Sequence, residues 1–179
     1  MTGPFRILPD GTILGCVHDD PLPAGMRGFV IDRNGMTLFS QPSSMHMGAT
    51  PNGKTFIGYY TSANATGGYG TGARTRGYLL DKDNFIPFDV PSSQLTLALD
   101  INPGRVTVGA YTDLAGKMHG FLVNTGDRPV ADWKFTTIDF PGATLTRVLG
   151  INAGGDIVGF YNDASGKTHG FLASPNTED

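Results

Sequence analysis

The first group of candidate functional residues combines two histidines, an arginine and neighbouring carboxylates. His18 is followed directly by Asp19 and Asp20, which places an imidazole beside two carboxylates. His46 and Arg147 lie in short segments that resemble inner strands, where a buried imidazole or cation needs a partner or a ligand. Together these groups could form an acid/base or an anion-binding cluster, and an enzyme would use His18, His46 and Asp19 as its catalytic residues. Alternatively, these polar side chains only form the solvated rim of the central channel.

A second group of histidines and aspartates recurs at fixed positions. His119 follows Asp113 by six residues, and His169 follows Asp163 by six residues. A feature present in successive copies of a repeat usually serves the repeat, so we expect each histidine to hydrogen-bond the aspartate of its own hairpin. An aspartate at the start of a loop can also cap its own backbone. We therefore expect this second group to build the scaffold.

A sequence repeat determines where all of these side chains lie. The segment Leu149–Leu172 reads LGINAGGDIVGFYNDASGKTHGFL, and Leu99–Leu122 reads LDINPGRVTVGAYTDLAGKMHGFL. The two segments align without a gap, and two fainter copies lie upstream. A repeat of this period indicates stacked supersecondary units.

Each copy contains short predicted strands joined by turns, with no room for a long helix. Good helix formers are scarce, whereas glycine (26 residues) and proline (12 residues) are frequent, which favours an all-β protein. We predict a single β-propeller domain over residues 1–179, built from about four blades of four antiparallel strands. The predicted repeats cover approximately residues 5–40, 45–90, 95–140 and 145–173.

One glycine recurs in the middle of the second strand of every copy. Glycine at such a position costs stability unless a neighbouring backbone or ring must approach closely. Alignment on this position also aligns His46 with Leu97 and Arg147 in the innermost strands. The recurring glycines are Gly15, Gly58, Gly109 and Gly159.

The fourth copy is incomplete, because the residues after Ala173 are too few and too polar for an outer strand. Closure of the ring must therefore be imperfect, or use another chain, or use further repeats. Because an unpaired strand edge invites association, a homo-oligomer formed through the open blade edge is one expected assembly.

The third and fourth copies resemble the HAF family of bacterial extracellular repeats. The resemblance rests on the pattern GIN-x-x-G-D-I-V-G-x-Y-x-D-x-x-G-x-x-H-G-F-L, followed by T-I-D-F-P-G-A, and on His119 and His169 at the start of the H-[AG]-F motif. Arg27 and Arg76 replace this histidine in the first two copies. The resemblance implies a propeller-like fold and an extracellular or periplasmic location, but no single activity.

In a propeller, the loops between the second and third strands share one face with the connections between blades, and that face usually holds the ligand site. The loop 62–75 on this face is long and glycine-rich, and its tyrosine suggests a flap or a contact loop. Functional residues are best sought where the copies disagree. The predicted ligand-binding residues at this channel mouth are Arg147, Asp20, Asp113, Asp163 and Tyr69.

Composition excludes several classes of function. The net charge of −3 and pI near 5.7 give no basic footprint for nucleic acid. No apolar run is long enough to span a membrane, and no signal peptide is visible at the start of the sequence. The lone Cys16 is expected in the core. No metal site or cofactor is predicted, since no spacing of ligands is diagnostic and no cysteine cluster exists. A nucleophile triad has no support either, because the sequence has no G-x-S-x-G motif.

These observations favour a binding or interaction module that presents its ligand site at the channel mouth. Its expected partner is a small molecule, a carbohydrate or a protein. The alternative is a small hydrolase or lyase that uses a His/Asp/Arg cluster at the same place, and a second alternative is a structural repeat protein of an envelope or matrix. Whether the chain is an enzyme stays open at this point.

Overall fold

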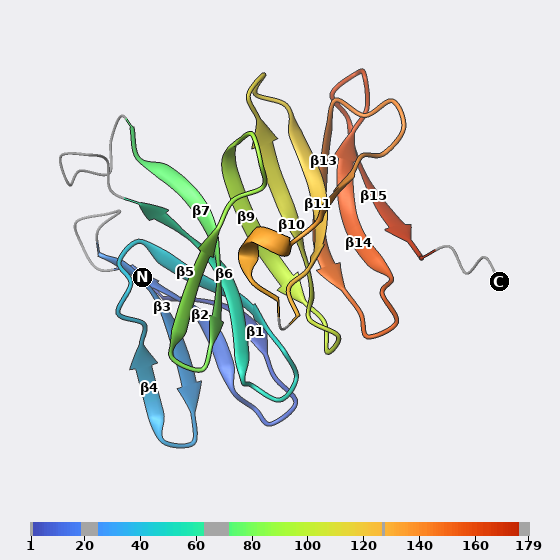
Figure 1. Ribbon diagram of the computed structural model, residues 1–179. Coiled ribbons are helices and arrows are strands. Elements are labelled where there is room, and N and C mark those ends of the chain that lie inside the picture. The colour runs from blue at the N-terminus through green and yellow to red at the C-terminus, as the bar shows by residue number, and fades with distance from the viewer. Residues whose placement is uncertain (1, 19–24, 63–71, 127, 176–179) are drawn as a thin grey trace.

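The computed structural model describes residues 2–18, 25–62, 72–126 and 128–175, which form four antiparallel sheets that follow one another along the chain (Figure 1). Within each sheet, the strands are neighbours in the order in which they occur in the sequence. The first blade consists of β1 (Thr2–Ile7), β2 (Ile13–His18), β3 (Met26–Asp32) and β4 (Gly35–Leu38). The second consists of β5 (Ser44–Ala49), β6 (Thr55–Ser62), β7 (Arg74–Asp81) and β8 (Asn84–Phe88).

The third and fourth blades come from the two strongest copies of the repeat. This succession of antiparallel sheets, one for each copy, confirms the predicted all-β propeller fold. The third blade consists of β9 (Ser93–Ile101), β10 (Val106–Asp113), β11 (Met118–Asn124) and β12 (Phe135–Ile138), with the 3-10 helix η1 (Val130–Asp132) before β12. The fourth has only β13 (Leu145–Ile151), β14 (Ile157–Asn162) and β15 (Thr168–Ala173). Within the described ranges, no helix is long and apolar enough to cross a membrane.

The first strand of each blade packs against the blade before it. β5 lies against the first blade, β9 against β6 and β7, and β13 against β10 and β11. Successive side chains of a strand point to opposite faces of the sheet, so the apolar side chains of one face pack into each contact between blades. In the last contact, Val108 and its cross-strand partner Leu122 pack with Val148 and Ile151 of β13. Burial of such side chains stabilises each blade contact by about 25 cal/mol per Å² of apolar surface removed from water.

The recurring mid-strand glycine lets the first strand of the blade and an aromatic ring of the third strand approach closely, as expected from a glycine at this position. A Cβ atom on Gly109 would overlap the carbonyl oxygen of Leu97 and the ring of Phe121. A Cβ atom on Gly159 would likewise overlap the carbonyl oxygen of Arg147. Each glycine faces a β-bulge in the first strand, where the register shifts by one residue. The bulge carries the inner strand over the second strand, and a side chain at the glycine would prevent this.

The predicted alignment of His46 with Leu97 and Arg147 is wrong by one residue. His46 pairs with Gly58, whereas Leu97 pairs with Ala110 and Arg147 pairs with Phe160. The cause is a β5–β6 turn that is one residue longer than the β9–β10 and β13–β14 turns, as the pairs that close these turns show. A slip of one residue moves a side chain to the opposite face of its strand. The closing pairs are Ala49–Phe56, Ile101–Thr107 and Ile151–Ile157.

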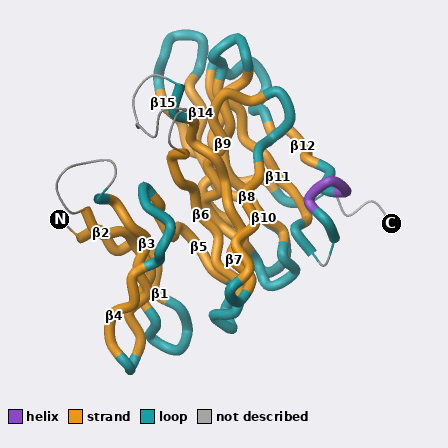
Figure 2. Tube along the Cα trace, turned by 60° about the vertical axis from the view of Figure 1, so that its left-hand side comes forward, coloured by secondary structure: helices purple, strands orange, loops and turns teal. Residues whose placement is uncertain are grey.

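The outward face of the fourth blade is not covered by another blade. The first and fourth blades lie at opposite ends of the row of sheets in Figure 1, and the described strands show no packing between them like that between neighbouring blades. Figure 2 likewise shows β1–β4 at one side of the molecule. Val158 is 47% exposed and Leu172 is 70% exposed, whereas Val108, the equivalent of Val158, is fully buried. Ile7 on β1 is also exposed, at 67%.

Candidate binding site

The interblade connections and the loops after the second strands lie at one end of the blades. The Thr61 N–H donates to the Ser43 carbonyl oxygen, and the Thr144 N–H donates to the Asn162 carbonyl oxygen. Each bond joins a connection to the end of a second strand. The two sets of loops therefore form one face, here called the loop face.

On the loop face, the third blade holds a histidine between two carboxylates. His119 Nδ1 lies 2.8 Å from Asp139 Oδ2, and its Nε2 lies 3.1 Å from Asp113 Oδ2. The imidazole also stacks on Tyr111, with 5.1 Å between ring centroids. Asp139 follows β12, so His119 ties the hairpin β10–β11 to the outer strand. This arrangement confirms that the recurring histidine bonds within its own hairpin.

The aspartates of these hairpins use both of their oxygens within the hairpin. Asp113 Oδ1 accepts hydrogen bonds from the N–H groups of Ala115 and Lys117, at 2.8 and 2.9 Å. Its contact with His119, followed by these backbone bonds, lowers the pKa of Asp113. These interactions leave little capacity for a ligand, so the predicted binding role of the aspartate gains no support from its surroundings.

The fourth blade repeats this hairpin arrangement. Asp163 Oδ1 accepts from the Ser165 and Lys167 N–H groups, and Oδ2 lies 2.8 Å from His169 Nε2. The Ser165 side chain, followed by His169, lowers the pKa of Asp163 strongly. The predicted binding role of Asp163 therefore gains no more support than that of Asp113.

The predicted catalytic and ligand-binding residues of the loop face lie only in part within the described residues. Asp19, Asp20 and Tyr69 lie outside them. His18 ends β2, and its Nε2 is 2.9 Å from the Sγ atom of Cys16. Cys16 is buried, as expected for a core residue, and this burial raises the pKa of its thiol.

A partly buried ion pair that sequence reasoning missed joins the inner strands of the first and third blades. Asp100 on β9 forms an ion pair with Arg6 on β1, although the two residues are 94 positions apart. The Asp100 carboxylate also accepts from the N–H groups of Ile101 and Ile151, at 2.8 and 3.1 Å. Burial raises the pKa of Asp100, and the Ile151 N–H and Arg6 partly oppose this shift. The Asp100 carboxylate therefore connects its own third blade to the first blade through Arg6 and to the fourth blade through the Ile151 N–H, near the propeller axis.

Glycines make room for this carboxylate in the other two inner strands. A Cβ atom on Gly48 would lie 3.1 Å from Asp100 Oδ1, and one on Gly150 would lie 3.5 Å from Oδ2. Arg6, Gly48, Asp100 and Gly150 occupy one aligned position, because they pair with equivalent residues of the second strands. A signal for this site was present in the sequence, where DIN in the third copy replaces GIN in the fourth.

Arg147 lies in the adjoining layer of the inner strands, nearer to the loop face than Gly150. Its Nε atom is sealed from solvent and has no hydrogen-bond partner among the described residues. Arg147 acts electrostatically on Tyr59 of β6, where burial raises the pKa of the phenol and Arg147 opposes that rise. Cys16 acts on the same phenol. Ionisable groups of the first and fourth blades therefore lie within electrostatic range of Tyr59 in the second blade.

His46 lies away from this cluster, in the contact between the first and second blades. Its ring packs against Gly28 of β3 and lies among the rings of Phe39, Phe56 and Tyr78. The predicted position of His46 on the channel wall is therefore wrong, for the register reason given above. Among the described members of the predicted cluster, Arg147 lies in an inner strand near the axis.

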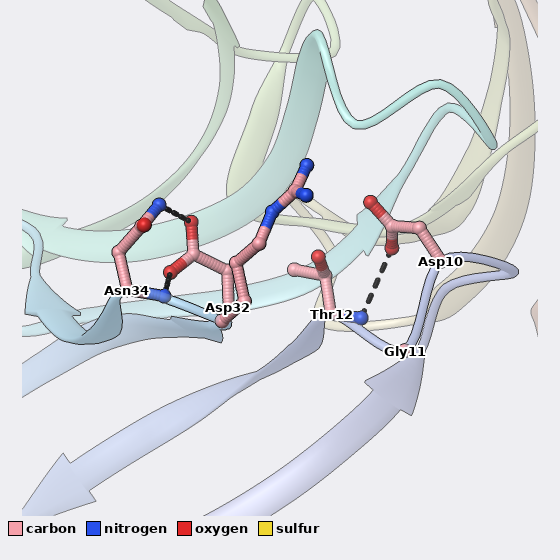
Figure 3. A pocket seen from close by; sticks show the side chains of 6 residues that line it. Asp10, Gly11, Thr12, Asp32 and Asn34 are labelled. Carbon is pink, nitrogen blue, oxygen red and sulfur yellow. Dashed lines mark hydrogen bonds between the residues drawn. The ribbon is translucent and has the colours of Figure 1, made fainter.

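The hollow drawn in Figure 3 lies at the hairpin tips of the first blade. Asp10 Oδ1 accepts from the Thr12 N–H at 3.0 Å, and Asp32 Oδ1 accepts from the Asn34 N–H at 2.7 Å (Figure 3). Both carboxylates thus stabilise their own turns. Across the described parts of the chain, no three His, Cys, Asp or Glu side chains are grouped to hold a metal ion.

Comparisons with known proteins agree with the architecture. No protein-family model matches the chain, and a search of curated proteins returns no match, so the resemblance to HAF repeats stays a prediction. Among solved structures, the crystal structure of TolB from Acinetobacter baumannii matches with a TM-score of 0.69 and 16% sequence identity. The chain shares the propeller fold of TolB. The match covers 99% of this chain and 41% of the TolB chain, so the chain spans about two fifths of TolB.

Proposed function

We propose that the protein is an extracellular or periplasmic binding module of the HAF-repeat type, which binds an anionic ligand at the loop-face end of the propeller axis through Arg147. The propeller fold suits interaction modules in general, since it holds loops and inner strands rigidly at one face. The location follows from the HAF resemblance. The ligand class follows from the surroundings of Arg147.

The observation that carries this proposal is the sealed Nε atom of Arg147, which lacks a hydrogen-bond partner. A buried polar group without a partner costs about 1–3 kcal/mol, and more when it is charged. Asp100, the acidic side chain of the neighbouring layer, is already paired with Arg6. Arg147 as a whole is only partly buried, so a ligand carboxylate that reaches its guanidinium would neutralise the charge, and guanidinium groups bind carboxylates through two parallel hydrogen bonds. Tyr59 would lie beside the bound group.

This arrangement favours binding over the hydrolase or lyase alternative. The proposed catalytic set needs His46 beside His18, but His46 packs between two blades instead. The hairpin aspartates Asp113 and Asp163 are occupied by their own loops. Within the described ranges, no carboxylate forms an ion pair with Arg147, so this guanidinium suits the binding of an anion.

Titration with glucuronate and with glucose tests the proposal, because the two sugars differ mainly by one carboxylate. We expect glucuronate to shift backbone amide NMR signals of β13 and β6, and glucose to leave them unchanged. Arg147→Ala should abolish the glucuronate shifts. The matched control Arg33→Ala removes an exposed arginine of a hairpin tip and should keep them. Equal responses to both sugars, no response to either sugar, or a full response in Arg147→Ala, would contradict the proposal.

A second observation supports an assembly role for the fourth blade. In each of the other blades, the third strand pairs with a fourth strand, whereas β15 has no outer partner among the described residues. Next to this free edge, Val158 and Leu172 pair across β14 and β15 and expose apolar surface. We propose that two copies of the chain associate through this blade, with β15 pairing antiparallel to its counterpart across a twofold axis. An unpaired strand edge is a template for such pairing.

Sedimentation over a range of protein concentrations tests this assembly. The wild-type chain should sediment as a dimer, and Leu172→Lys should sediment as a monomer. Leu114→Lys is the matched control, because Leu114 is 69% exposed against 70% for Leu172 but lies in a hairpin loop of the third blade. A wild-type chain that stays monomeric, or a Leu172→Lys variant that stays dimeric, would exclude this interface.

A further inference from the structure

A second hollow, independent of the proposed function, lies beside the contact between the first and second blades. Its volume is about 420 Å³, within the range of small-molecule sites. Its walls come from β3 and β4, the following connection, β5 and the β7–β8 hairpin. The apolar lining residues are Val30, Leu38, Phe39 and Leu80, and the polar ones include His46, Lys82 and Asp83.

His46 is the unusual member of this lining, because it is only 2% exposed and occupies a position that the repeat fills with apolar residues. Its equivalents in the third and fourth blades are Ala98 and Val148, which pair with the same mid-strand glycine. Val148 packs on Gly120 as His46 packs on Gly28. An apolar side chain therefore satisfies the packing, and the imidazole needs another explanation.

Hydrogen bonds around His46 determine which ring nitrogen carries the proton. The Tyr78 hydroxyl donates its single hydrogen to the Met45 carbonyl oxygen at 2.9 Å. His46 Nδ1 lies 2.6 Å from the same hydroxyl oxygen, and with the hydroxyl hydrogen directed to the Met45 carbonyl we assign Nδ1–H as the donor in that contact. Burial also lowers the pKa of His46 to about 4, so the ring is neutral near pH 7. It follows that Nε2 carries a lone pair and acts as an acceptor.

The Nε2 acceptor has no hydrogen-bond partner among the described residues, yet it is not one of the sealed polar atoms. His46 lines the hollow, and the rings of Phe39, Phe56 and Tyr78 surround its other sides. An acceptor at the edge of an apolar groove favours a ligand that combines a flat apolar body with one hydroxyl or N–H donor. The acceptor then fixes the orientation of the ligand, and the apolar walls supply most of the affinity.

We propose that this hollow is a small-molecule site for planar, mainly apolar ligands that donate one hydrogen bond to His46 Nε2. Phenols fit this description, because an aromatic ring can lie against Phe39 and Leu38 while its hydroxyl reaches the imidazole. Lys82 and Asp83 at the rim would tolerate a polar substituent on the far side of the ring. Tyr78 positions the imidazole by holding Nδ1.

Binding of p-cresol and toluene to the full-length protein tests the site, because the two molecules differ by one hydroxyl group. We expect p-cresol to bind about fivefold more tightly than toluene, as one hydrogen bond predicts. Only p-cresol should shift the 15N resonance of His46 Nε2. Leu38→Trp should fill the groove and abolish binding of both molecules. Leu114→Trp adds the same ring at an exposed leucine elsewhere and should bind p-cresol as the wild type does.

Three outcomes would overturn the proposal. The first is no binding of p-cresol, and the second is equal affinity for p-cresol and toluene, which would remove the role of the acceptor. The third is unchanged p-cresol binding in Leu38→Trp, which would place the ligand elsewhere. Since Leu38 is 43% exposed, this variant should fold, and its circular dichroism spectrum checks that it does.

Discussion

The third and fourth blades are similar in sequence over their first three strands but have very different surroundings. β9–β11 lie between the second blade and the fourth, and β12 covers their outer edge. β13–β15 have a neighbour on one side only and no outer strand among the described residues. The comparison separates what a repeat sequence determines within a blade from what only the position of that blade in the row determines.

Packing depends on position. Phe121 is fully buried, but its equivalent Phe171 is only partly buried. Leu122 is partly buried against the fourth blade, but Leu172 is 70% exposed. Hairpin geometry, in contrast, is the same in both blades. Asp113 at the end of β10 and Asp163 directly after β14 cap equivalent N–H groups and contact equivalent histidines. Short-range hydrogen bonds therefore follow the sequence, and burial follows the neighbours.

The largest difference is expected when the same aromatic side chain is removed from each blade. Phe121→Ala should lower the free energy of unfolding by about 3–5 kcal/mol, because it leaves a cavity in a core that cannot collapse. Phe171→Ala should cost about half as much, since solvent and relaxation can fill the space. Urea denaturation of both variants measures the difference. Equal losses would mean that the fourth blade is covered in solution, and a concentration-dependent loss for Phe171→Ala would identify a second copy as the cover.

The same contrast explains which features the sequence could predict. The strands, the turns, the close approach at Gly109 and the His119–Asp113 contact depend on residues within one copy, so the repeat pattern was sufficient to predict them. The missing outer strand was also predictable, because too few residues follow Ala173. These features need no knowledge of how the blades are placed relative to one another.

Features that depend on register or on distant contacts were missed. One additional residue in the β5–β6 turn moved His46 to the opposite face of its strand, and counting from Gly58 could not reveal this. The Arg6–Asp100 pair joins residues 94 positions apart, and pairing at that distance has no local signature. The difference between Asp100 and Gly150 in the aligned copies is nevertheless visible in the sequence, and such differences between copies are where functional residues are best sought.

The smallest effect is expected at the hairpin aspartates. There, substitution should change the pH dependence of stability in the same direction in both blades. Hydrogen bonds lower the pKa of Asp113 and Asp163 in the folded state. The unfolded chain therefore binds more protons at low pH, so stability from both groups is present above the unfolded pKa of about 4 and is lost as pH falls below it. Asp113→Asn and Asp163→Asn should each reduce the loss of stability between pH 5 and pH 3.

Urea midpoints at these two pH values measure this effect, with Asp83→Asn as the control. Asp83 is exposed, and the described structure shows no hydrogen bond to its carboxylate. The change at Asp163 should be at least as large as that at Asp113, because Asp163 also accepts from the Ser165 hydroxyl. A response in the third blade alone would show that burial by neighbours, rather than the hairpin itself, sets the acid behaviour. The acid response of the hairpin would then depend on the position of its blade in the row, as the burial of Phe121 and Phe171 does.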